Sequence, residues 1–500
     1  MKGFVCLFGS DAAWRFVANG AFDALEARHD VTYVALRWGE LMERDGLAGL
    51  LAQGGRRVVW LPGYAHRTRQ WAELFNISCI TYQDRSPSFA VRAREQERQD
   101  PAGFNRLRQL AEPGRYEQHR GTAERRLGFH PELLSLVLKE RPDFLVLPSK
   151  LQDGLTHDAL QLADALRLPS LLLVSTWDNL SSKGLLFHRP TMVGCWGEQS
   201  RSHAVEVQGM APERVCVVGA PHYGGLSQPA PVDRAAVRQA LGVPAQGPVV
   251  LFAGSLRPFD ETQLLQAIDE AVADGRVPPL HVLYRPHPWR GARAHETSFH
   301  DVRWRHVSMD PQLAEAYRRT KEQGSRFTAD NFLFELEHLF ALYQAADAVI
   351  SPMSTVLLES FMAGRPTMAI AFGDGKHSWS PEKVAQMLHF KEFYEAPDLV
   401  VCRSADEWLP GLRRLLSQVG DAAVRERLRE QSRFFVHQDD RTYGARVSDA
   451  VERMIGQAGP PAYGRVRLKA GPRFAVEDLF SPHAVKQALG RFAGAKSAVE

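Results

Sequence analysis

Uninterrupted apolar runs alternate with helical patterns along the first part of the chain. The apolar runs lie at residues 3–8, 31–36, 143–148, 170–175 and 215–221. A helical pattern follows the first run as far as Ala27, and another covers 157–168. Strands that are apolar on both faces are typical of a parallel sheet covered by helices on each side. The pattern therefore predicts an α/β domain.

The same alternation restarts further along the chain. Apolar runs recur at 248–255, 279–288, 346–351 and 366–372, with a helix expected from about Glu261. The preceding stretch, 226–247, carries three prolines and small polar residues, as linkers do. We therefore expect two Rossmann-like halves. Their sheets would present their carboxyl ends to a shared cleft, the place where open α/β sheets bind ligands.

These boundaries divide the chain into four parts. We expect a first domain at 1–225, a linker at 226–247, a second domain at 248–460 and a basic tail at 461–500. Within the first domain, 85–126 holds ten Arg and six acidic residues, which predicts a solvated helical insertion; a lid or acceptor-binding arm is the alternative. The tail is expected to form a final helix packing back on the halves, with contact to anionic lipid as the alternative.

Composition narrows the class of protein. Hydrophobic residues make up 44% and charged residues 24%, and 61 basic side chains nearly balance 58 acidic ones. This balance gives no support for a nucleic-acid partner. The five cysteines are scattered without a CxxC pair, so we expect reduced thiols and a cytoplasmic protein. No run approaches the roughly 18 apolar residues that span a bilayer, so any membrane contact would be peripheral, at the inner face.

The stretch SPMSTVLLESFMAGRP, from Ser351 to Pro366, follows a predicted strand. A helix beginning at Ser354 would point its free amides and the positive end of its dipole out of the sheet edge. With the hydroxyls of Ser351, Ser354 and Thr355, this arrangement suits a phosphate. Glu359, one turn later, could accept hydrogen bonds from a ribose. The alternative is structural, because Ser is a good helix cap.

Two further strand ends carry cationic or small residues. YRPHPWR places Arg285 and His287 after one strand, where an imidazole and a guanidinium would face a leaving phosphate. Gly254, Ser255 and Arg257 follow another strand, and the glycine permits close backbone approach. The sequence has neither GxGxxG nor a Walker motif at this point, which disfavours nicotinamide cofactors and ATP hydrolysis. We expect no cofactor beyond a nucleotide-sugar substrate.

These motifs resemble those of GT-B glycosyltransferases. STVLLESFMAGRP is similar to their nucleotide-binding signature, whose Glu commonly holds the donor ribose. YRPHP and SPMST resemble the paired HP and Ser/Thr motifs of bacterial polysaccharide sialyltransferases, Kdo transferases and glycerophosphotransferases, which use cytidine nucleotides. STWDNLSSKG, at 175–184, resembles GT-B-like proteins of bacterial surface-polysaccharide loci. The resemblance covers roughly 140–370 and implies a GT-B fold with His287, Ser354, Thr355 and Glu359 at the donor; the base is left open between cytidine and uridine.

The acidic pair of retaining enzymes is absent, because the residue eight positions before Glu359 is Ser351. This departure favours inversion, which needs a base to deprotonate the acceptor hydroxyl. Asp11, after the first strand, and Asp178, in TWDN, are the candidates, with Asp153 and His157 third; each carboxylate has a capping or turn role as its alternative.

Beside Asp178, Trp177 could stack on a sugar, and Asn179 and Lys183 could hold the acceptor. No DxD motif stands where a metal-bridged diphosphate would need it, so no metal is expected.

The sequence thus predicts a glycosyltransferase that moves a sugar from a nucleotide donor to a bacterial glycan or glycolipid. Three alternatives stay open. A glycerophosphotransferase would use the same HP and Ser/Thr groups, a nucleotide-sugar 2-epimerase would need no acceptor, and an inactive partner would bind the nucleotide sugar without turning it over.

Overall fold

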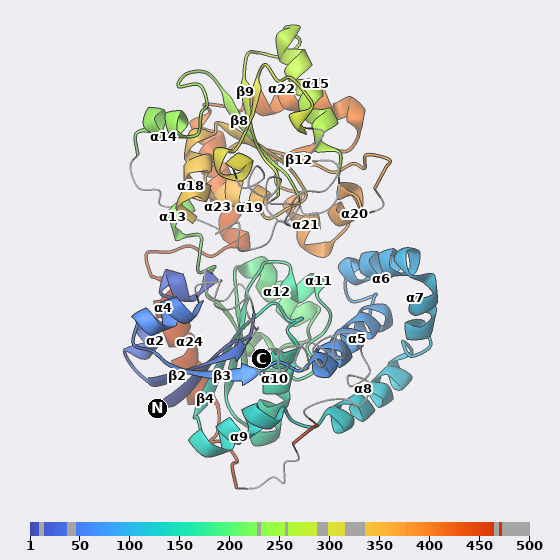
Figure 1. The fold of residues 1–500 in the computed structure, drawn as a ribbon, viewed down its shortest axis with the longest axis vertical. Helices are drawn as coiled ribbons and strands as arrows, with labels where there is room; N and C mark the ends of the chain where they lie inside the picture. Colours follow the sequence, from blue (N-terminus) through green and yellow to red (C-terminus); the bar gives the residue numbers. More distant parts are fainter. Residues whose placement is uncertain are drawn as a thin grey trace, which may run out of the picture.

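The computed structural model describes residues 1–9, 15–37, 47–227, 232–255, 259–287, 299–315, 336–377, 379–464 and 470–472. They form two lobes, each built around its own sheet (Figure 1). The first half of the chain forms the lower lobe in this view, and most of the second half forms the upper lobe.

The first sheet is parallel throughout its described strands, in the order β3-β2-β1-β4-β5-β6-β7. The strands are β1 (Lys2–Leu7), β2 (Asp30–Arg37), β3 (Arg57–Pro62), β4 (Phe144–Ser149), β5 (Ser170–Val174), β6 (Met192–Cys195) and β7 (Val215–Val217). The chain order reverses between β1 and β4. Such a switch point opens a crevice at the carboxyl ends of the two strands.

Helices cover both faces of this sheet. One face packs on α9 (Pro131–Glu140), α10 (Gly154–Leu166) and α12 (Glu198–Glu206). The other packs on α2 (Asp23–Glu26), α4 (Leu47–Gln53) and α24 (Tyr443–Gln457). The sequence division assigned residues 443–457 to the second half. The apolar stripe of α24, which includes Val447, Val451 and Met454, instead lies against the first sheet, because that face has otherwise only short helices.

The second sheet is also parallel in its described strands, in the order β10-β9-β8-β11-β12-β13. Its strands are β8 (Val249–Ala253), β9 (His281–Arg285), β10 (Val307–Met309), β11 (Ala348–Pro352), β12 (Thr367–Ile370) and β13 (Val400–Cys402). The order reverses between β8 and β11, so the stretch opening at Ser351 lies at the switch point. The predicted α/β class with two Rossmann-like units is confirmed.

Two cores flank the second sheet. One lies under α15 (Glu261–Ala273) and α22 (Trp408–Ser417). The other lies under α18 (Leu336–Ala345), α19 (Val356–Met362), α20 (Pro381–Ala385), α21 (Leu388–Phe393) and α23 (Ala422–Phe435). This second core also takes in Trp177 and Trp196 from the first half, so buried apolar packing continues from one lobe into the other.

The stretch predicted as a linker contains regular structure. It holds the end of α13 (Gly224–Ser227) and α14 (Arg234–Ala240), which Asp233 caps. Arg238 is buried and ion pairs with Asp347 at 2.7 Å, just before β11. Three prolines therefore mark a connection that packs on the second half.

The Arg-rich insertion is helical, as expected. After α5 (Ala65–Thr81) it forms α6 (Pro87–Gln99), α7 (Pro101–Arg108) and α8 (Pro113–Leu127), at one side of the lower lobe (Figure 1). α6 reaches the second half, because Ser88 Oγ accepts a bond from the Leu388 amide at 2.9 Å and Glu95 pairs with Lys383 at 3.4 Å. The insertion therefore bridges the lobes as well as meeting solvent.

The first residues after α24 return to the first half. Ala462 N donates to Leu166 O at 2.7 Å, and the Tyr463 hydroxyl donates to Pro142 O at 2.5 Å. Most of the predicted basic tail lies outside the described residues.

All five cysteines are free thiols. Among the helices the structure describes, none combines the length and the apolar character that crossing a bilayer requires.

Candidate functional site

The switch point of the second sheet gathers small polar residues. Ser351 Oγ lies 2.8 Å from the Ala253 carbonyl of β8 and 2.8 Å from Ser354 Oγ, so it spans the two strands at which the chain order reverses. The Gly254 amide donates to the carbonyl of Arg285 at 2.8 Å, which joins the end of β9 to the same place. The structure therefore brings Gly254, Ser351 and Ser354 together.

The helix after Ser354 begins two residues later than the sequence indicated. α19 starts at Val356, with Thr355 in the capping position and no hydrogen bond from its side chain to the helix. Ser354 and Thr355 are half-buried. Their hydroxyls thus lie at the helix start without serving as caps.

Glu359 is buried, and both of its oxygens accept tyrosine hydroxyls. Tyr223 donates to Oε1 at 2.9 Å and Tyr343, on α18, donates to Oε2 at 2.7 Å. Burial, followed by the charge of Glu359, raises the pKa of each tyrosine well above its ordinary value, so both hydroxyls remain protonated donors. A ribose at this carboxylate would use lone pairs that the tyrosines leave available.

A buried carboxylate that the sequence did not single out holds the loop after β8. Glu261 Oε1 accepts the Ser255 amide at 3.1 Å, and Oε2 accepts the Tyr284 hydroxyl at 2.8 Å. A Cβ at Gly254 would come within 2.4 Å of Glu261 Oε2. Gly254 is therefore required by its closeness to the Glu261 side chain. The close approach to a ligand that the sequence predicted is not needed to explain this glycine.

Arg285 is buried in an ion pair with Asp310. Asp310 also accepts His338 Nε2 at 2.8 Å and the Gln312 amide at 3.0 Å. Burial raises the pKa of Asp310, but the His338 bond and the Arg285 charge outweigh it and hold the pKa below its ordinary value. The Arg285 guanidinium is thus neutralised by Asp310 inside the second half. The sequence predicted that it would face a phosphate.

His287 lies two residues beyond β9 and is half-buried, after the buried Pro286. It is therefore at the carboxyl edge, as predicted. Arg257 and Asp11 lie outside the described residues, so their predicted roles remain predictions.

In the first half, Asp178 is held by two hydroxyls and a lysine. Its oxygens accept the hydroxyls of Thr176 at 2.6 Å and Ser182 at 2.8 Å, and Lys183 Nζ lies 3.3 Å away. Burial raises the pKa of Asp178, but Lys183, the neighbouring His389 and these hydroxyls lower it far below the ordinary range. A carboxylate stabilised to this degree is a weak Brønsted base.

The two neighbours of Asp178 have structural contacts. The Trp177 ring is 2% exposed and packs edge-to-face on His389, Phe390 and Phe393, with centroids 5.2, 5.2 and 5.9 Å away. It joins the first half to α21 and offers no face to a sugar, contrary to the expectation. Asn179 is buried. Its Oδ1 accepts the Thr176 amide at 3.0 Å, and its Nδ2 donates to Thr176 Oγ1 at 2.5 Å.

Residues that the sequence did not single out link the two carboxyl edges. Arg15 donates to His222 Nε2 at 3.0 Å and lies 3.4 Å from the Ser175 carbonyl, after β5. The His222 ring lies against Tyr223, with centroids 3.9 Å apart. Burial, followed by the Arg15 charge, lowers the pKa of His222 well below its ordinary value, so the imidazole is neutral and accepts. The aromatic pair His222 and Tyr223, directly after the apolar run 215–221, was the available sequence signal.

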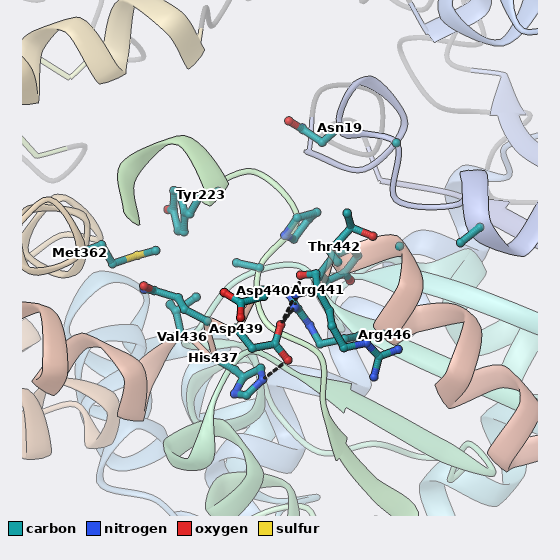
Figure 2. Close-up of a pocket in the computed structure, with 18 of the residues that line it drawn as sticks. Asn19, Tyr223, Met362, Val436, His437, Asp439, Asp440, Arg441, Thr442 and Arg446 are labelled. Atoms are coloured by element: carbon teal, nitrogen blue, oxygen red, sulfur yellow. Dashed lines mark hydrogen bonds and ion pairs between the residues drawn. The ribbon is translucent and has the colours of Figure 1, made fainter. Parts of the chain in front are cut away.

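A cavity of about 750 Å³ lies beside Tyr223, where the chain crosses between the lobes. Figure 2 shows Tyr223 and Met362 on one side, Asn19 on the other, and the polar stretch from His437 to Thr442 between them. Asp439 pairs with Arg446 at 2.5 Å and with His437 at 3.2 Å, so its carboxylate is held by neighbouring residues of the cavity wall.

A smaller cavity, about 100 Å³, opens at the switch point of the first sheet. Its wall includes Phe8 after β1, Leu36 on β2, Pro62 on β3 and Asp153 after β4. Asp153 Oδ2 lies 3.3 Å from both Ser149 Oγ and the Lys150 amide. His157 is buried behind it with a pKa lowered to about 4 by burial, so it is neutral and away from solvent.

No protein-family model and no curated protein matches the chain. Solved structures match along nearly their whole length. A putative UDP-N-acetylglucosamine 2-epimerase from Listeria monocytogenes has 11% identity and a TM-score of 0.52, with 92% of this chain and 97% of that chain covered. A glycosyltransferase from Rickettsia africae ESF-5 has 10% identity and a TM-score of 0.50, with 92% and 99% covered. The chain therefore has the GT-B fold.

Proposed function

We propose that the protein transfers a sugar from a nucleotide-sugar donor, bound by the second half, to a glycan acceptor, bound by the first. The observation that carries this proposal is the switch point of the second sheet, where Ser351 bridges β8 and β11 and Ser354 and Thr355 stand at the start of α19. A crevice of this kind is the usual ligand site of such sheets. Hydroxyls and small residues there suit a phosphorylated ligand.

In this proposal the donor's phosphates lie against Ser255, Ser354 and Thr355, and its ribose lies near Glu359. His287 donates to the leaving phosphate oxygen, and Arg257 adds a positive charge. Arg285 contributes through its ion pair with Asp310, which fixes the end of β9 immediately before His287.

The acceptor hydroxyl must lose its proton as its oxygen attacks the anomeric carbon and the nucleotide leaves. Asp178 is poorly suited to take that proton, because its pKa is held far below the working range. We therefore assign the base to Asp11, which follows the residues of β1 in the sequence, and give Asp178 the task of holding the 176–183 turn. The cavity lined by Phe8 and Asp153 is the proposed place for the acceptor.

Two proteins of like fold, a glycosyltransferase and a putative UDP-N-acetylglucosamine 2-epimerase, support nucleotide-sugar chemistry. Epimerisation is therefore the second candidate. It differs in needing no acceptor, since the sugar nucleotide would be both substrate and product. The substrate named for the epimerase is a uridine nucleotide, whereas the HP and Ser/Thr motifs favour cytidine nucleotides.

A thermal-shift panel with CMP, CDP, UDP and GDP tests the donor site, because a ligand that binds the folded state raises the melting temperature. The matching nucleotide sugar is then incubated with and without glycan acceptor, and the products are identified by NMR. A new glycosidic bond supports transfer. Interconversion without acceptor favours the epimerase, a phosphodiester favours the glycerophosphotransferase, and binding without turnover favours the inactive partner.

A further inference from the structure

One carboxylate, that of Glu359, is held by two tyrosines that come from different places in the chain. Tyr343 lies on α18, in the same half as Glu359. Tyr223 lies in the segment that leaves the first sheet after β7. Both are buried, and their bonds to the carboxylate are of similar length, 2.7 and 2.9 Å. Only the Tyr223 bond connects Glu359 with the segment that joins the halves.

Tyr223 is tied to the first half by its neighbour. The His222 ring packs on it and accepts a bond from Arg15 at 3.0 Å, and Arg15 also reaches the Ser175 carbonyl beyond β5. His222 also packs against Trp196, with centroids 5.6 Å apart. A movement of the first sheet relative to α19 must therefore bend or break the contact between Tyr223 and Glu359.

The surroundings of Tyr223 allow such a movement. The ring lines the 750 Å³ cavity, which also touches Asn19 from the first half and Met362 from the end of α19 (Figure 2). Both tyrosines belong to the same buried apolar cluster, but Tyr343 does not line that cavity. The two tyrosines thus make the same kind of bond to Glu359, but of the two only Tyr223 borders the cavity.

We propose that Tyr223 is a positioning residue that couples the two halves: its hydroxyl bond to Glu359 sets the position of the donor half relative to the Arg15 and His222 edge of the first half. This inference rests on the proposed function for its catalytic consequence. Donor bound near Glu359 stabilises the arrangement in which the Tyr223 bond is made. Losing that bond lowers the populated fraction of the binding-competent arrangement and weakens apparent affinity by that fraction.

The test compares Tyr223→Phe with its matched control Tyr343→Phe, since each removes one hydroxyl from the same carboxylate. Small-angle X-ray scattering measures the radius of gyration of the full chain with and without the nucleotide that binds best. We expect Y223F to be more expanded than wild type without nucleotide and to return to the wild-type value at saturation. Y343F should have the wild-type radius under both conditions.

Steady-state kinetics supply the second readout. Y223F should raise the donor KM about tenfold, the scale of one lost hydrogen bond to a charged group, while kcat at saturating donor stays close to wild type. His222→Phe keeps a ring against Tyr223 but removes the acceptor for Arg15. It should reproduce the expansion, and it serves as the test if Y223F does not fold.

Equal radii for Y223F, His222→Phe and wild type would overturn the coupling, and so would equal expansion of Y223F and Y343F. A loss of kcat with unchanged donor KM would contradict a positioning role. These outcomes are separable from the fate of the proposed function. If no nucleotide sugar is turned over, the scattering comparison still decides the coupling; if the radii do not differ, sugar transfer can still stand.

Discussion

Arg285 and Asp310 form a buried ion pair at the carboxyl end of β9, with Asp310 wholly inaccessible to solvent. Arg285 pairs with Asp310 Oδ2, and the other oxygen, Oδ1, accepts both His338 Nε2 and the Gln312 amide. The pair joins β9, the turn after β10 and α18. It therefore fixes the strand end from which His287 extends.

Asp310→Asn should destabilise the fold by about 3–5 kcal/mol, because it leaves the Arg285 charge buried without its counter-ion. Urea denaturation measures this loss. The pKa of Asp310 is lowered in the folded state, so its contribution is complete above the ordinary pKa of an aspartate and is lost as the pH falls through the folded value. Asp274→Asn, on a solvent-exposed pair with Arg276, is the control and should change stability by no more than about 1 kcal/mol. Equal losses from both variants would contradict the ion-pair assignment.

His287→Ala should lower turnover by about 10²-fold, the usual scale for a positioned acid or electrostatic group. His281 provides a control on the same strand. It lies at the opposite end of β9 and bonds Ser308 Oγ at 2.8 Å, so His281→Gln should keep turnover near wild type. Initial-rate measurements at saturating donor compare the two. Turnover of H287A equal to that of H281Q would remove His287 from the site.

Asp11→Asn should abolish most turnover, by about 10²–10⁴-fold, if Asp11 is the general base. Asp178→Asn should instead lower the melting temperature, because it replaces one of the two oxygens that accept the Thr176 and Ser182 hydroxyls with an NH2 donor and removes the charge that pairs with Lys183. Its remaining activity should keep the wild-type pH profile, since Asp178 is ionised throughout the working range. A pH–rate profile that loses its acidic limb in D178N would reverse the two assignments.

Glu359→Ala should weaken nucleotide binding more than it lowers turnover at saturation. Titration calorimetry with the best nucleotide measures the affinity. The variant also leaves the Tyr223 and Tyr343 hydroxyls buried without an acceptor, which costs about 1–3 kcal/mol for each. Glu359→Gln keeps one acceptor oxygen and separates the two effects. Unchanged affinity in both variants would overturn the ribose assignment.

Acid should destabilise the contact between the halves through His389. Burial is the main cause that lowers the pKa of His389 to about 3, and burial lowers that of nearby His203 to about 4. Both are neutral when folded and bind protons when unfolded, so their contribution is complete above pH ~6.5 and falls progressively below it. His389→Gln should reduce the loss of melting temperature between pH 7 and pH 5. The same loss in wild type and variant would exclude His389 as its source.

The alternation of apolar runs was sufficient to predict both sheets, because strands buried on both faces need apolar residues at every position. The runs at 143–148 and 170–175 became β4 and β5 almost residue for residue. The predicted runs did not include β3 and β6 of the first sheet or β10 and β13 of the second, so the sequence predicted the two sheets but only part of their strands. The helix expected up to Ala27 is, where described, only a 3-10 turn and the four residues of α2.

Contacts in the candidate site between residues close in sequence could be predicted, whereas contacts between residues far apart in sequence could not. Ser351 and Ser354 are three residues apart, so one turn brings them together. Glu359 and Tyr223 are 136 positions apart, and Arg285 and Asp310 meet only through strand order. Trp177 shows the same limit, because an exposed ring for a sugar and a buried ring between lobes look alike in sequence. Burial and long-range pairing arise from tertiary packing, which local pattern does not encode.

The position of α24 has a consequence for how the chain is made. Val5, Val146 and Leu171 of the first sheet share a core with Val447 and Met454, which leave the ribosome only after the whole second sheet has been synthesised. Until α24 has been synthesised, that face of the first sheet is an apolar surface that is only partly covered by helices. The amino-terminal lobe should therefore reach its final packing late in biosynthesis, and a nascent chain stalled before residue 443 should remain a chaperone client.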